Sequence, residues 1–302
     1  MTCALIRSVK VTWRHIMEQQ PVYGSLEALS PRVAAIHDIS GFGKCSLTVV
    51  LPILSAAGLE ACAIPTAILS THTGGFSNFT YHDLTDDIMP VYKHWQELGI
   101  RFDAAYSGYL GSHAQLGIVS DIYKCMRADG TKIIVDPVMA DNGALYALFD
   151  ESFPLGMRAL CEAADVIVPN ITEAVLMLGE PYKEGPYTRE YIEGLLKRLA
   201  ELPSELVVLT GVHFDENELG AACIDVKTGK IEYAMTNRIA GSYHGTGDIF
   251  ASVLTAGLLL GKAPRDAMQK AADFTADAVR RTLEAGRGVK YGVWFEAGLR
   301  DL

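Results

Sequence analysis

Runs of apolar residues recur along the chain, and most are separated by segments long enough to form a helix. Within these runs the side chains are almost continuously apolar instead of alternating with polar ones. Such runs are typical of strands buried on both faces, as in parallel sheets covered by helices. The strand-like runs, in chain order, are RVAAIH, LEACAIP, AAYSG, TKIIVD, DVIVPN, ELVVLTG, LGAACID and KIEYAMT.

Segments between these runs carry apolar residues at helical spacing, as in Ile88–Leu98 and Ala114–Arg127. Repeated strand–helix units with right-handed crossovers build an αβα sandwich around a mostly parallel central sheet. Near the end of the chain, Thr228 and Gly229 lie between two strand-like runs and predict one antiparallel hairpin.

Two predicted helices, Thr246–Leu260 and Pro264–Glu284, follow the hairpin. No internal repeat, low-complexity tract or long linker divides the sequence. We therefore expect a single α/β domain over residues 31–302. Residues 1–30 fit none of these patterns and are interpreted as an N-terminal extension of undefined role.

Composition and charge narrow the classes of partner. Hydrophobic residues make up 49% of the 302 positions and charged residues 21%, a normal globular balance. The net charge of −10 and the lack of a basic cluster argue against nucleic acid as a partner. The start of the chain lacks the apolar segment of a secretory signal, and the longest uncharged apolar run near the C-terminus, Ile249–Gly261, is too short to span a bilayer.

The cysteines indicate a reducing compartment. No two of the six have the spacing of a metal site or of a CxxC motif, and several lie inside apolar runs. Buried free thiols persist in reducing environments, so we expect a cytoplasmic protein. Because no apolar run is long enough to span a bilayer, we expect no membrane partner. The cysteines are Cys3, Cys45, Cys62, Cys125, Cys161 and Cys223.

Polar clusters follow five of the predicted strands. Because the carboxyl ends of parallel strands meet at one edge of a sheet, and open α/β sheets bind ligands there, these clusters predict a ligand site at that edge. In strand order the clusters are HD, SGYLGS, DPVMAD, PNITE and TGVH.

The turn after the first strand, DISGFGKCS (Asp38–Ser46), has the layout of a phosphate-binding loop: a strand, a glycine-rich turn, a lysine and a helix. A P-loop requires a glycine where this chain has Asp38 and a hydroxyl residue where it has Cys45. A carboxylate at that point would repel phosphate. We therefore reject a P-loop here, and we interpret Lys44 as a solvated lysine.

The stretch HGTGD (residues 244–248) is the strongest local signal. Gly245 and Gly247 allow a tight turn with exposed backbone N–H groups, and the helix that follows directs its positive end to the same place. This combination predicts an anion hole for phosphate. Asp248 lies in the first helical turn. An acid there can simply favour the helix start, but beside two glycines and the polar strand ends a catalytic role is favoured.

Gly-Thr-Gly-Asp at 245–248 resembles the anion hole and catalytic aspartate of the ribokinase-like superfamily. SGYLGS, DPVM and PNITE resemble motifs of its vitamin B6 (pyridoxal and pyridoxamine) kinase branch, in the expected order. STHT (Ser70–Thr73) resembles the Ser-Asn-His-Thr stretch of those kinases, with Thr71 in place of asparagine. The resemblance covers about residues 32–285 and implies ATP-dependent phosphorylation of a hydroxymethyl group.

The resemblance implies a role for each polar cluster. Asp248 would accept the substrate hydroxyl proton, and we expect the helix N-terminus to keep it ionised. Asp136 and Glu173 would lie near Mg²⁺, mostly through water, although a turn residue before Pro137 and a helix-start acid are the alternatives. A monovalent cation such as K⁺ is a further candidate cofactor. The residues assigned to the ATP phosphates are Gly245, Thr246, Gly247, Asn170, Thr210 and Gly211.

The substrate side would be formed by the end of the first strand and two loops. Tyr109 offers a ring that can stack on a pyridine, or else fills the core. His72 offers a polar contact, or else bonds to loop backbone. Related B6 kinases have a neutral serine where this chain has Asp38. The residues assigned to the substrate are Asp38, Ser70, His72, Thr73 and Tyr109.

A hydroxymethylpyrimidine kinase is the main alternative. Such enzymes commonly have cysteine in place of Asp248, which favours the B6 branch, but they share His244 before the glycines. A sugar kinase is disfavoured because no β-rich lid segment occurs near the N-terminus. A non-catalytic nucleotide-binding relative would have no need of Asp248. Members of the superfamily branch are typically dimers, so we expect a homodimer that binds ATP and a small-molecule substrate.

Overall fold

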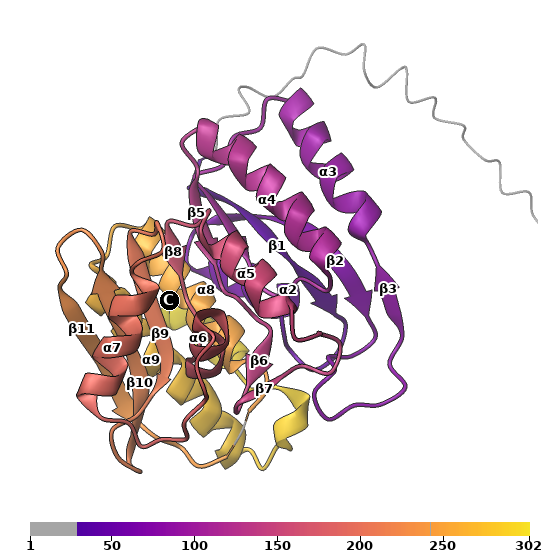
Figure 1. Cartoon of the computed structure of the whole chain (residues 1–302). Coiled ribbons are helices and arrows are strands. Elements are labelled where there is room, and N and C mark those ends of the chain that lie inside the picture. The colour runs from indigo at the N-terminus through magenta and orange to yellow at the C-terminus, as the bar shows by residue number, and fades with distance from the viewer. Residues whose placement is uncertain (1–28, 242) are drawn as a thin grey trace, which may run out of the picture.

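The computed structural model describes residues 29–241 and 243–302, and its core is a nine-stranded sheet (Figure 1). The strand order is β11-β10-β9-β8-β5-β4-β1-β2-β3. Six neighbouring strands pair in parallel, which confirms the mostly parallel sheet expected from the sequence. They are β1 (Arg32–Ser40), β2 (Glu60–Leu69), β4 (Ala104–Ser107), β5 (Lys132–Val135), β8 (Val166–Ile167) and β9 (Leu206–Val212).

Antiparallel strands close both edges of the sheet. The predicted hairpin is present as β10 (Glu218–Asp225) and β11 (Ile231–Asn237), and β10 also pairs antiparallel with β9. At the opposite edge β3 (Tyr81–Asp83) pairs with β2. The sequence analysis missed β3 because all three of its residues are exposed and none belongs to an apolar run. A separate small hairpin, β6 (Ala140–Asp141) and β7 (Ala144–Leu145), follows β5.

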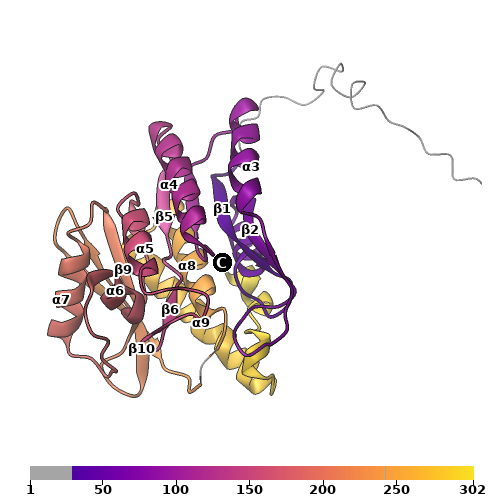
Figure 2. The same ribbon diagram turned by 45° about the vertical axis from the view of Figure 1, so that its right-hand side comes forward.

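Helices cover both faces of the sheet (Figure 2). One face carries α2 (Leu47–Ala56), α8 (Thr246–Leu259) and α9 (Pro264–Glu284). The other face carries α3 (Thr85–Glu97), α4 (His113–Ala128), α5 (Phe153–Cys161), α6 (Ile171–Leu178) and α7 (Arg189–Leu199). Two short 3₁₀ helices, η1 (Val289–Tyr291) and η2 (Glu296–Asp301), follow α9.

Each central strand supplies side chains to two separate apolar cores. Along β1, Val33 and Ala35 lie in the core beneath α2, α8 and α9, whereas Ala34 and Ile36 lie in the core beneath α3–α7. Alternate side chains of a strand face opposite sides of a sheet, so burial on both sides requires the continuous apolar runs seen in the sequence.

The N-terminal extension, the cysteines and the apolar segments were also interpreted from the sequence. Of the predicted extension, residues 1–28 lie outside the described residues, as does Cys3. The other five cysteines are free thiols. Within the described part of the chain, none of the helices combines the length and the apolar character needed to cross a membrane.

Candidate active site

The carboxyl ends of the parallel strands lie at one edge of the sheet, beside the first turn of α8. The segment between β1 and α2, Gly41–Ser46, is called the glycine loop, and Gly245–Asp248 is called the anion-hole turn. Because α2 packs beside α8, the glycine loop that precedes α2 lies against the anion-hole turn. The edge predicted from the polar clusters is therefore where these segments meet.

The two glycines of the anion-hole turn serve different needs. Gly245 precedes α8 with a left-handed backbone (φ 80°), and a Cβ there would lie 2.2 Å from the carbonyl oxygen of Lys44. A Cβ on Gly247 would meet no atom within 4 Å. Gly245 is thus required by the close approach of the glycine loop, whereas Gly247 borders open space. First-turn N–H groups of a helix have no partner within the helix, so they are free to bind an anion in that space.

Thr246 lies between these glycines and contributes to the shape of the turn. Its hydroxyl donates a hydrogen bond to the carbonyl oxygen of Tyr243, at 3.1 Å. The side chain therefore stabilises the segment that enters α8. Its backbone N–H belongs to the same unpartnered first turn as that of Gly247.

Asp248 faces the glycine loop from the first turn of α8. One carboxylate oxygen accepts a hydrogen bond from the backbone N–H of Ser46, at 2.9 Å. Burial, assisted by the charge of Asp38, raises the pKa of Asp248 to about 7. We expected the helix N-terminus to keep Asp248 ionised, whereas a pKa of about 7 leaves the group partly protonated at neutral pH, because loss of hydration outweighs the Ser46 hydrogen bond.

Asp38 is the second carboxylate beside Ser46, and only 4% of it is exposed. The Ser40 hydroxyl donates to its Oδ2 at 3.0 Å. Burial raises the pKa of Asp38, while hydrogen bonds from the serines oppose the rise. Burial raises the pKa values of Tyr81 and Tyr109, and the charge of Asp38 adds to both shifts.

Tyr109 lines the site beside Asp38 and is half-buried. Its ring packs against Phe149, with centroids 5.5 Å apart. Ser70 is exposed, and its hydroxyl accepts a hydrogen bond from the backbone N–H of Thr80 at 2.9 Å. Thr73 is exposed as well. Of these three residues, only Tyr109 has its side chain partly withdrawn from solvent, packed against a second ring.

His72 has no ring nitrogen left for a ligand. The Gly74 N–H donates to Nδ1 at 3.1 Å, which leaves Nε2 to donate to the carbonyl oxygen of Lys290 at 2.8 Å. Its ring lies where a side chain on Gly43 would be, and it stacks obliquely on His244 with centroids 4.7 Å apart. These bonds match the alternative stated for His72, a histidine bonded to loop backbone, and the side chain ties together the loops around the anion-hole turn.

Glu173 and Asn170 form the capping box of α6. The Asn170 side chain accepts from the Glu173 N–H at 2.9 Å, and Glu173 Oε2 accepts from the Asn170 N–H at 2.8 Å. Glu173 Oε1 accepts from the Met139 N–H, and the Asn170 amide donates to the carbonyl oxygen of Ala140. These side chains bind the segment after β5 to the start of α6. Both ends of the Asn170 amide are paired within this segment, and the assignment of Asn170 to the ATP site stays a prediction.

Asp136 contrasts with Glu173. It is 6% exposed, and no described residue donates a hydrogen bond to its carboxylate. Burial and the charges of Glu173 and Asp248 raise its pKa well above the ordinary value. A buried, unpaired carboxylate between two others is a place where a cation would be stabilised.

Of the two predicted metal-binding acids, Asp136 is better suited to Mg²⁺ than Glu173. Among residues 29–241 and 243–302, no three His, Cys, Asp or Glu side chains gather closely enough to hold a metal ion by themselves. Mg²⁺ usually keeps several waters and takes one or two carboxylates, so the unpaired Asp136 suits it. Burial raises the pKa of Glu173 to about 8, and its two oxygens already accept backbone hydrogen bonds.

Thr210 and Gly211 lie at the carboxyl end of β9. Thr210 forms a β-bridge with Asn170, and Gly211 is exposed with a left-handed backbone (φ 76°). They therefore lie on the same side of the edge as α6. Two contributors to the site were missed by the sequence analysis: Ser46, through its backbone N–H, and Tyr81 of β3. No sequence pattern marks a backbone donor, and β3 itself was not predicted.

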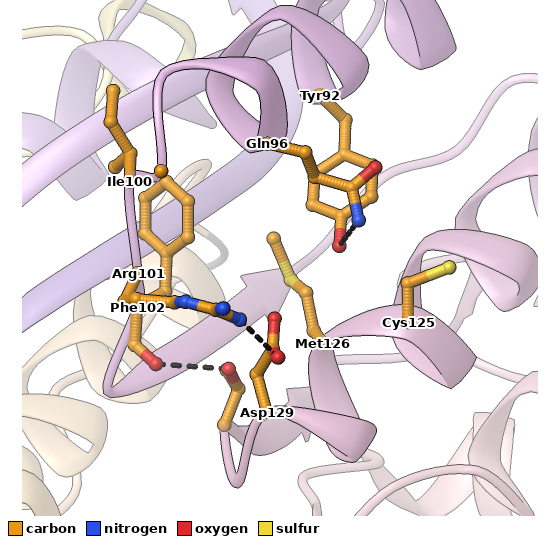
Figure 3. A pocket seen from close by; sticks show the side chains of 10 residues that line it. Tyr92, Gln96, Ile100, Arg101, Phe102, Cys125, Met126 and Asp129 are labelled. Atoms are coloured by element: carbon orange, nitrogen blue, oxygen red, sulfur yellow. Dashed lines mark hydrogen bonds and ion pairs between the residues drawn. The ribbon is translucent and has the colours of Figure 1, made fainter.

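A pocket of about 270 Å³ lies elsewhere, between the ends of α3 and α4 (Figure 3). Arg101 pairs with Asp129 there, and the Gln96 amide donates to the Tyr92 hydroxyl at 3.0 Å. Its lining comes from the last turns of α3 and α4 and from the residues just before β4 and β5. It is therefore at the opposite end of the sheet from Asp248 and takes no part in this site.

Known proteins resemble the chain over most of its length. Residues 51–292 match the phosphomethylpyrimidine kinase family. Pyridoxal kinase PdxY of Granulibacter bethesdensis is 28% identical over 244 residues, covering 77% of this chain and 83% of that protein. Hydroxymethylpyrimidine/phosphomethylpyrimidine kinase of Bacillus subtilis is 27% identical over 239 residues, covering 78% of this chain and 83% of that protein.

Solved structures show the same fold. A Bacteroides thetaiotaomicron protein assigned to the phosphomethylpyrimidine kinases, crystallised with pyridoxal, has a TM-score of 0.86 and 38% identity, over 90% of this chain and 95% of that one. Pyridoxal kinase from Lactobacillus plantarum has a TM-score of 0.81 and 32% identity, over 91% and 96%. The fold is therefore ribokinase-like, and the chain belongs to the phosphomethylpyrimidine kinase family, as a relative of its pyridoxal kinases.

Proposed function

We propose that this kinase transfers the terminal phosphoryl group of ATP to the hydroxymethyl group of a B6 vitamer, with Asp248 as the general base. The observation that carries the proposal is the position of Asp248. Its carboxylate lies in the first turn of α8, between the open space beside Gly247 and the buried Asp38. A hydroxymethyl group placed between Asp38 and Gly247 would present its proton to Asp248.

The protonation behaviour of Asp248 suits this role. A general base works best when its pKa lies near the working pH, and the pKa of Asp248 is about 7. An aspartate at its ordinary pKa would be a much weaker base. Burial in the site therefore supplies the basicity.

The phosphate side would be formed by the first turn of α8. The backbone N–H groups of Thr246 and Gly247 would bind the transferring phosphoryl group, and Gly211 at the end of β9 would approach the other phosphates. Mg²⁺ bound beside Asp136 would neutralise phosphate charge. Phosphoryl transfer depends mainly on such positioning and charge stabilisation, so few side chains are needed.

The choice of a B6 vitamer is supported by two relatives. The Bacteroides thetaiotaomicron protein, 38% identical, holds pyridoxal, and a pyridoxal kinase is 32% identical. Tyr109 and Asp38 offer a ring and a carboxylate to a hydroxymethylpyridine. Hydroxymethylpyrimidine is the second candidate substrate, because the matched family and the Bacillus subtilis relative act on the pyrimidine.

ADP release with Mg-ATP tests the proposal against that alternative. Pyridoxal, pyridoxine, pyridoxamine and hydroxymethylpyrimidine are supplied separately, and Asp248→Asn serves as the matched control for background hydrolysis. We expect at least one vitamer to be phosphorylated with a higher kcat/KM than the pyrimidine. Preference for the pyrimidine would contradict the proposal. The expected homodimer is tested on the same preparation by light scattering.

A further inference from the structure

The glycine loop has a backbone shape that other segments must stabilise. Gly43, Lys44 and Ser46 all have left-handed φ angles, of 111°, 60° and 54°. Such angles are uncommon for residues other than glycine, so Lys44 and Ser46 keep them only where surrounding contacts favour this shape. Two groups of contacts, on opposite sides of the loop, do so.

One side of the loop contacts the proposed catalytic groups. The carbonyl oxygen of Lys44 lies against Gly245, so closely that a Cβ on that glycine would be 2.2 Å from it. The backbone N–H of Ser46 donates to Asp248. The position of the loop therefore determines both the shape of the anion-hole turn and the hydrogen bonding of Asp248.

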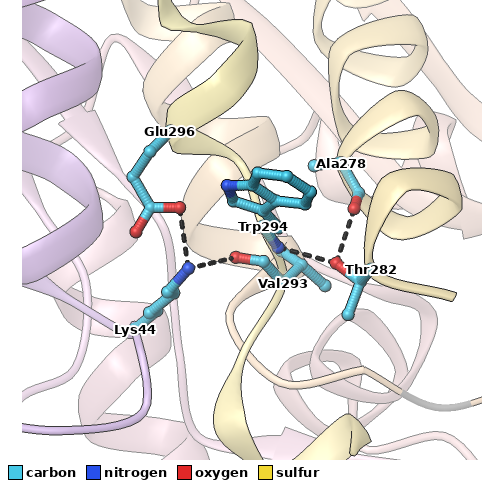
Figure 4. Close-up of polar contacts among 6 residues, drawn as sticks. All are labelled: Lys44, Ala278, Thr282, Val293, Trp294 and Glu296. Atoms are coloured by element: carbon cyan, nitrogen blue, oxygen red, sulfur yellow. Dashed lines mark hydrogen bonds and ion pairs between the residues drawn. The ribbon is translucent and has the colours of Figure 1, made fainter. Parts of the chain in front are cut away.

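The other side contacts the segment after α9 (Figure 4). Lys44 Nζ pairs with Glu296 Oε2 at 2.7 Å and donates to the carbonyl oxygen of Val293 at 3.2 Å. A Cβ on Gly292 would lie 2.2 Å from the carbonyl oxygen of Gly43. The Lys44 side chain is 18% exposed, so the sequence-based interpretation of a solvated lysine was wrong.

The segment that receives Lys44 is itself fixed to α9. The Trp294 N–H donates to the Thr282 hydroxyl at 2.6 Å, and that hydroxyl donates to the carbonyl oxygen of Ala278 at 2.7 Å. Thr282 is fully buried. Because the segment is anchored to a long packed helix, the Lys44–Glu296 contact connects the glycine loop to a rigid part of the fold.

We propose that Lys44 and Glu296 are positioning residues, whose contact keeps the glycine loop closed against Gly245 and Asp248. The kinetic part of this inference rests on the proposed kinase function; the structural part does not. The substrate and the phosphates bind only where the loop is closed, so the closed fraction sets the apparent affinity.

The proposal predicts a specific kinetic signature. When Lys44 loses its charge, the closed fraction of the loop falls, and the apparent dissociation constant rises in inverse proportion to that fraction. Saturating substrate restores the closed loop. We therefore expect Lys44→Met to raise the KM of the vitamer about tenfold with kcat within about twofold, the free-energy equivalent of about 1.4 kcal/mol. Partial unfolding would instead lower kcat and leave KM unchanged.

Three further variants test the pairing. Glu296→Gln should raise KM in the same way, and Lys44→Arg, which keeps the charge, should remain within about threefold of the wild type. The double variant Lys44→Met/Glu296→Gln should be no worse than Lys44→Met, because the partners act through one contact. Lys132→Met is the matched control. It removes an ion pair with Glu205 (3.0 Å) at the other end of the sheet, and its kinetics should not change.

Amide hydrogen exchange of the glycine loop provides a readout that does not require turnover. The loop amides, including that of Ser46, should exchange about tenfold faster in Lys44→Met than in the wild type and in Lys132→Met. Unchanged exchange together with an unchanged KM would overturn the proposal, as would additive effects of the two substitutions. If the wild type phosphorylates no substrate, the proposed function fails, and the exchange rates alone decide whether the contact closes the loop.

Discussion

The proposed phosphate side and the proposed substrate side of this site are constructed in different ways. The phosphate side is centred on four consecutive residues, Gly245–Asp248, at the start of one helix. The substrate side combines β1, the glycine loop, β3 and the segment after β4, and it is closed by residues near the C-terminus. A function carried by one helix start is visible as a motif, whereas one assembled from distant segments depends on the fold.

Removal of the base should have the largest effect, because both sides converge on Asp248. We expect Asp248→Asn to lower kcat by about a hundredfold or more, since an amide cannot accept the substrate proton. ATP binding, measured by calorimetry, should be largely retained. Asp266→Asn, at the first turn of α9, is the matched control for a helix-start acid and should be neutral. A near-normal kcat in Asp248→Asn would refute its role.

The next largest effect should distinguish the two glycines of the phosphate side. Gly247→Val should raise the KM for ATP at least tenfold, because the branched side chain occupies the open space beside the N–H groups. Its melting temperature should stay near that of the wild type. Gly245→Val should lower the melting temperature, because the new side chain collides with Lys44 and the backbone is left-handed. An unchanged KM for ATP in folded Gly247→Val would remove the anion-hole interpretation.

On the substrate side, Asp38→Ser should change the choice of vitamer. A charge-assisted hydrogen bond to a protonated amine is worth roughly 1.5–3 kcal/mol. We therefore expect kcat/KM for pyridoxamine to fall about tenfold more than that for pyridoxal. An equal loss for both vitamers would indicate a contact with the shared ring instead. Unchanged kinetics with lower stability would mean that Asp38 only stabilises the turn through Ser40.

The dependence on pH tests Asp248 without any substitution. Asp248 must be ionised to accept a proton, and its pKa of about 7 lies above the usual range for aspartate. As the pH falls through 7, kcat/KM should therefore decline about tenfold per unit, and it should level off above about pH 8. A profile that stays flat down to pH 5 would show that the base titrates at its ordinary pKa and that burial does not control it.

The sequence predicted the sheet, the helices and the helix-start motif because each depends on residues close together in the chain. Continuous apolar runs mark doubly buried strands, and Gly245–Asp248 carries its own geometry. For His72 and Glu173 the sequence left two alternatives open, a functional contact or a structural one, and the spacing of Asn170 and Glu173 is that of a capping box. The distant backbone partners of these side chains, such as the carbonyl oxygen of Lys290 and the N–H of Met139, depend on the fold and could not be predicted.

Lys44 shows the other limit of sequence interpretation. Its partner Glu296 is 252 residues away, and no pattern in the sequence links the two residues. A solvated lysine was expected because lysine side chains are mostly exposed in folded proteins. Only the packing of α8 and α9 on the sheet brings the C-terminal segment beside the turn that follows β1.

The separation between Lys44 and Glu296 also has a consequence for biosynthesis. A ribosome adds roughly 5–20 residues per second, so the glycine loop emerges some 10–50 s before the residue that pairs with it. For most of that interval β1 has no helix α8 or α9 to cover one of its faces. A nascent chain can thus form most of its sheet before Glu296 is available, and the contact proposed to keep the glycine loop closed forms only after that residue leaves the ribosome.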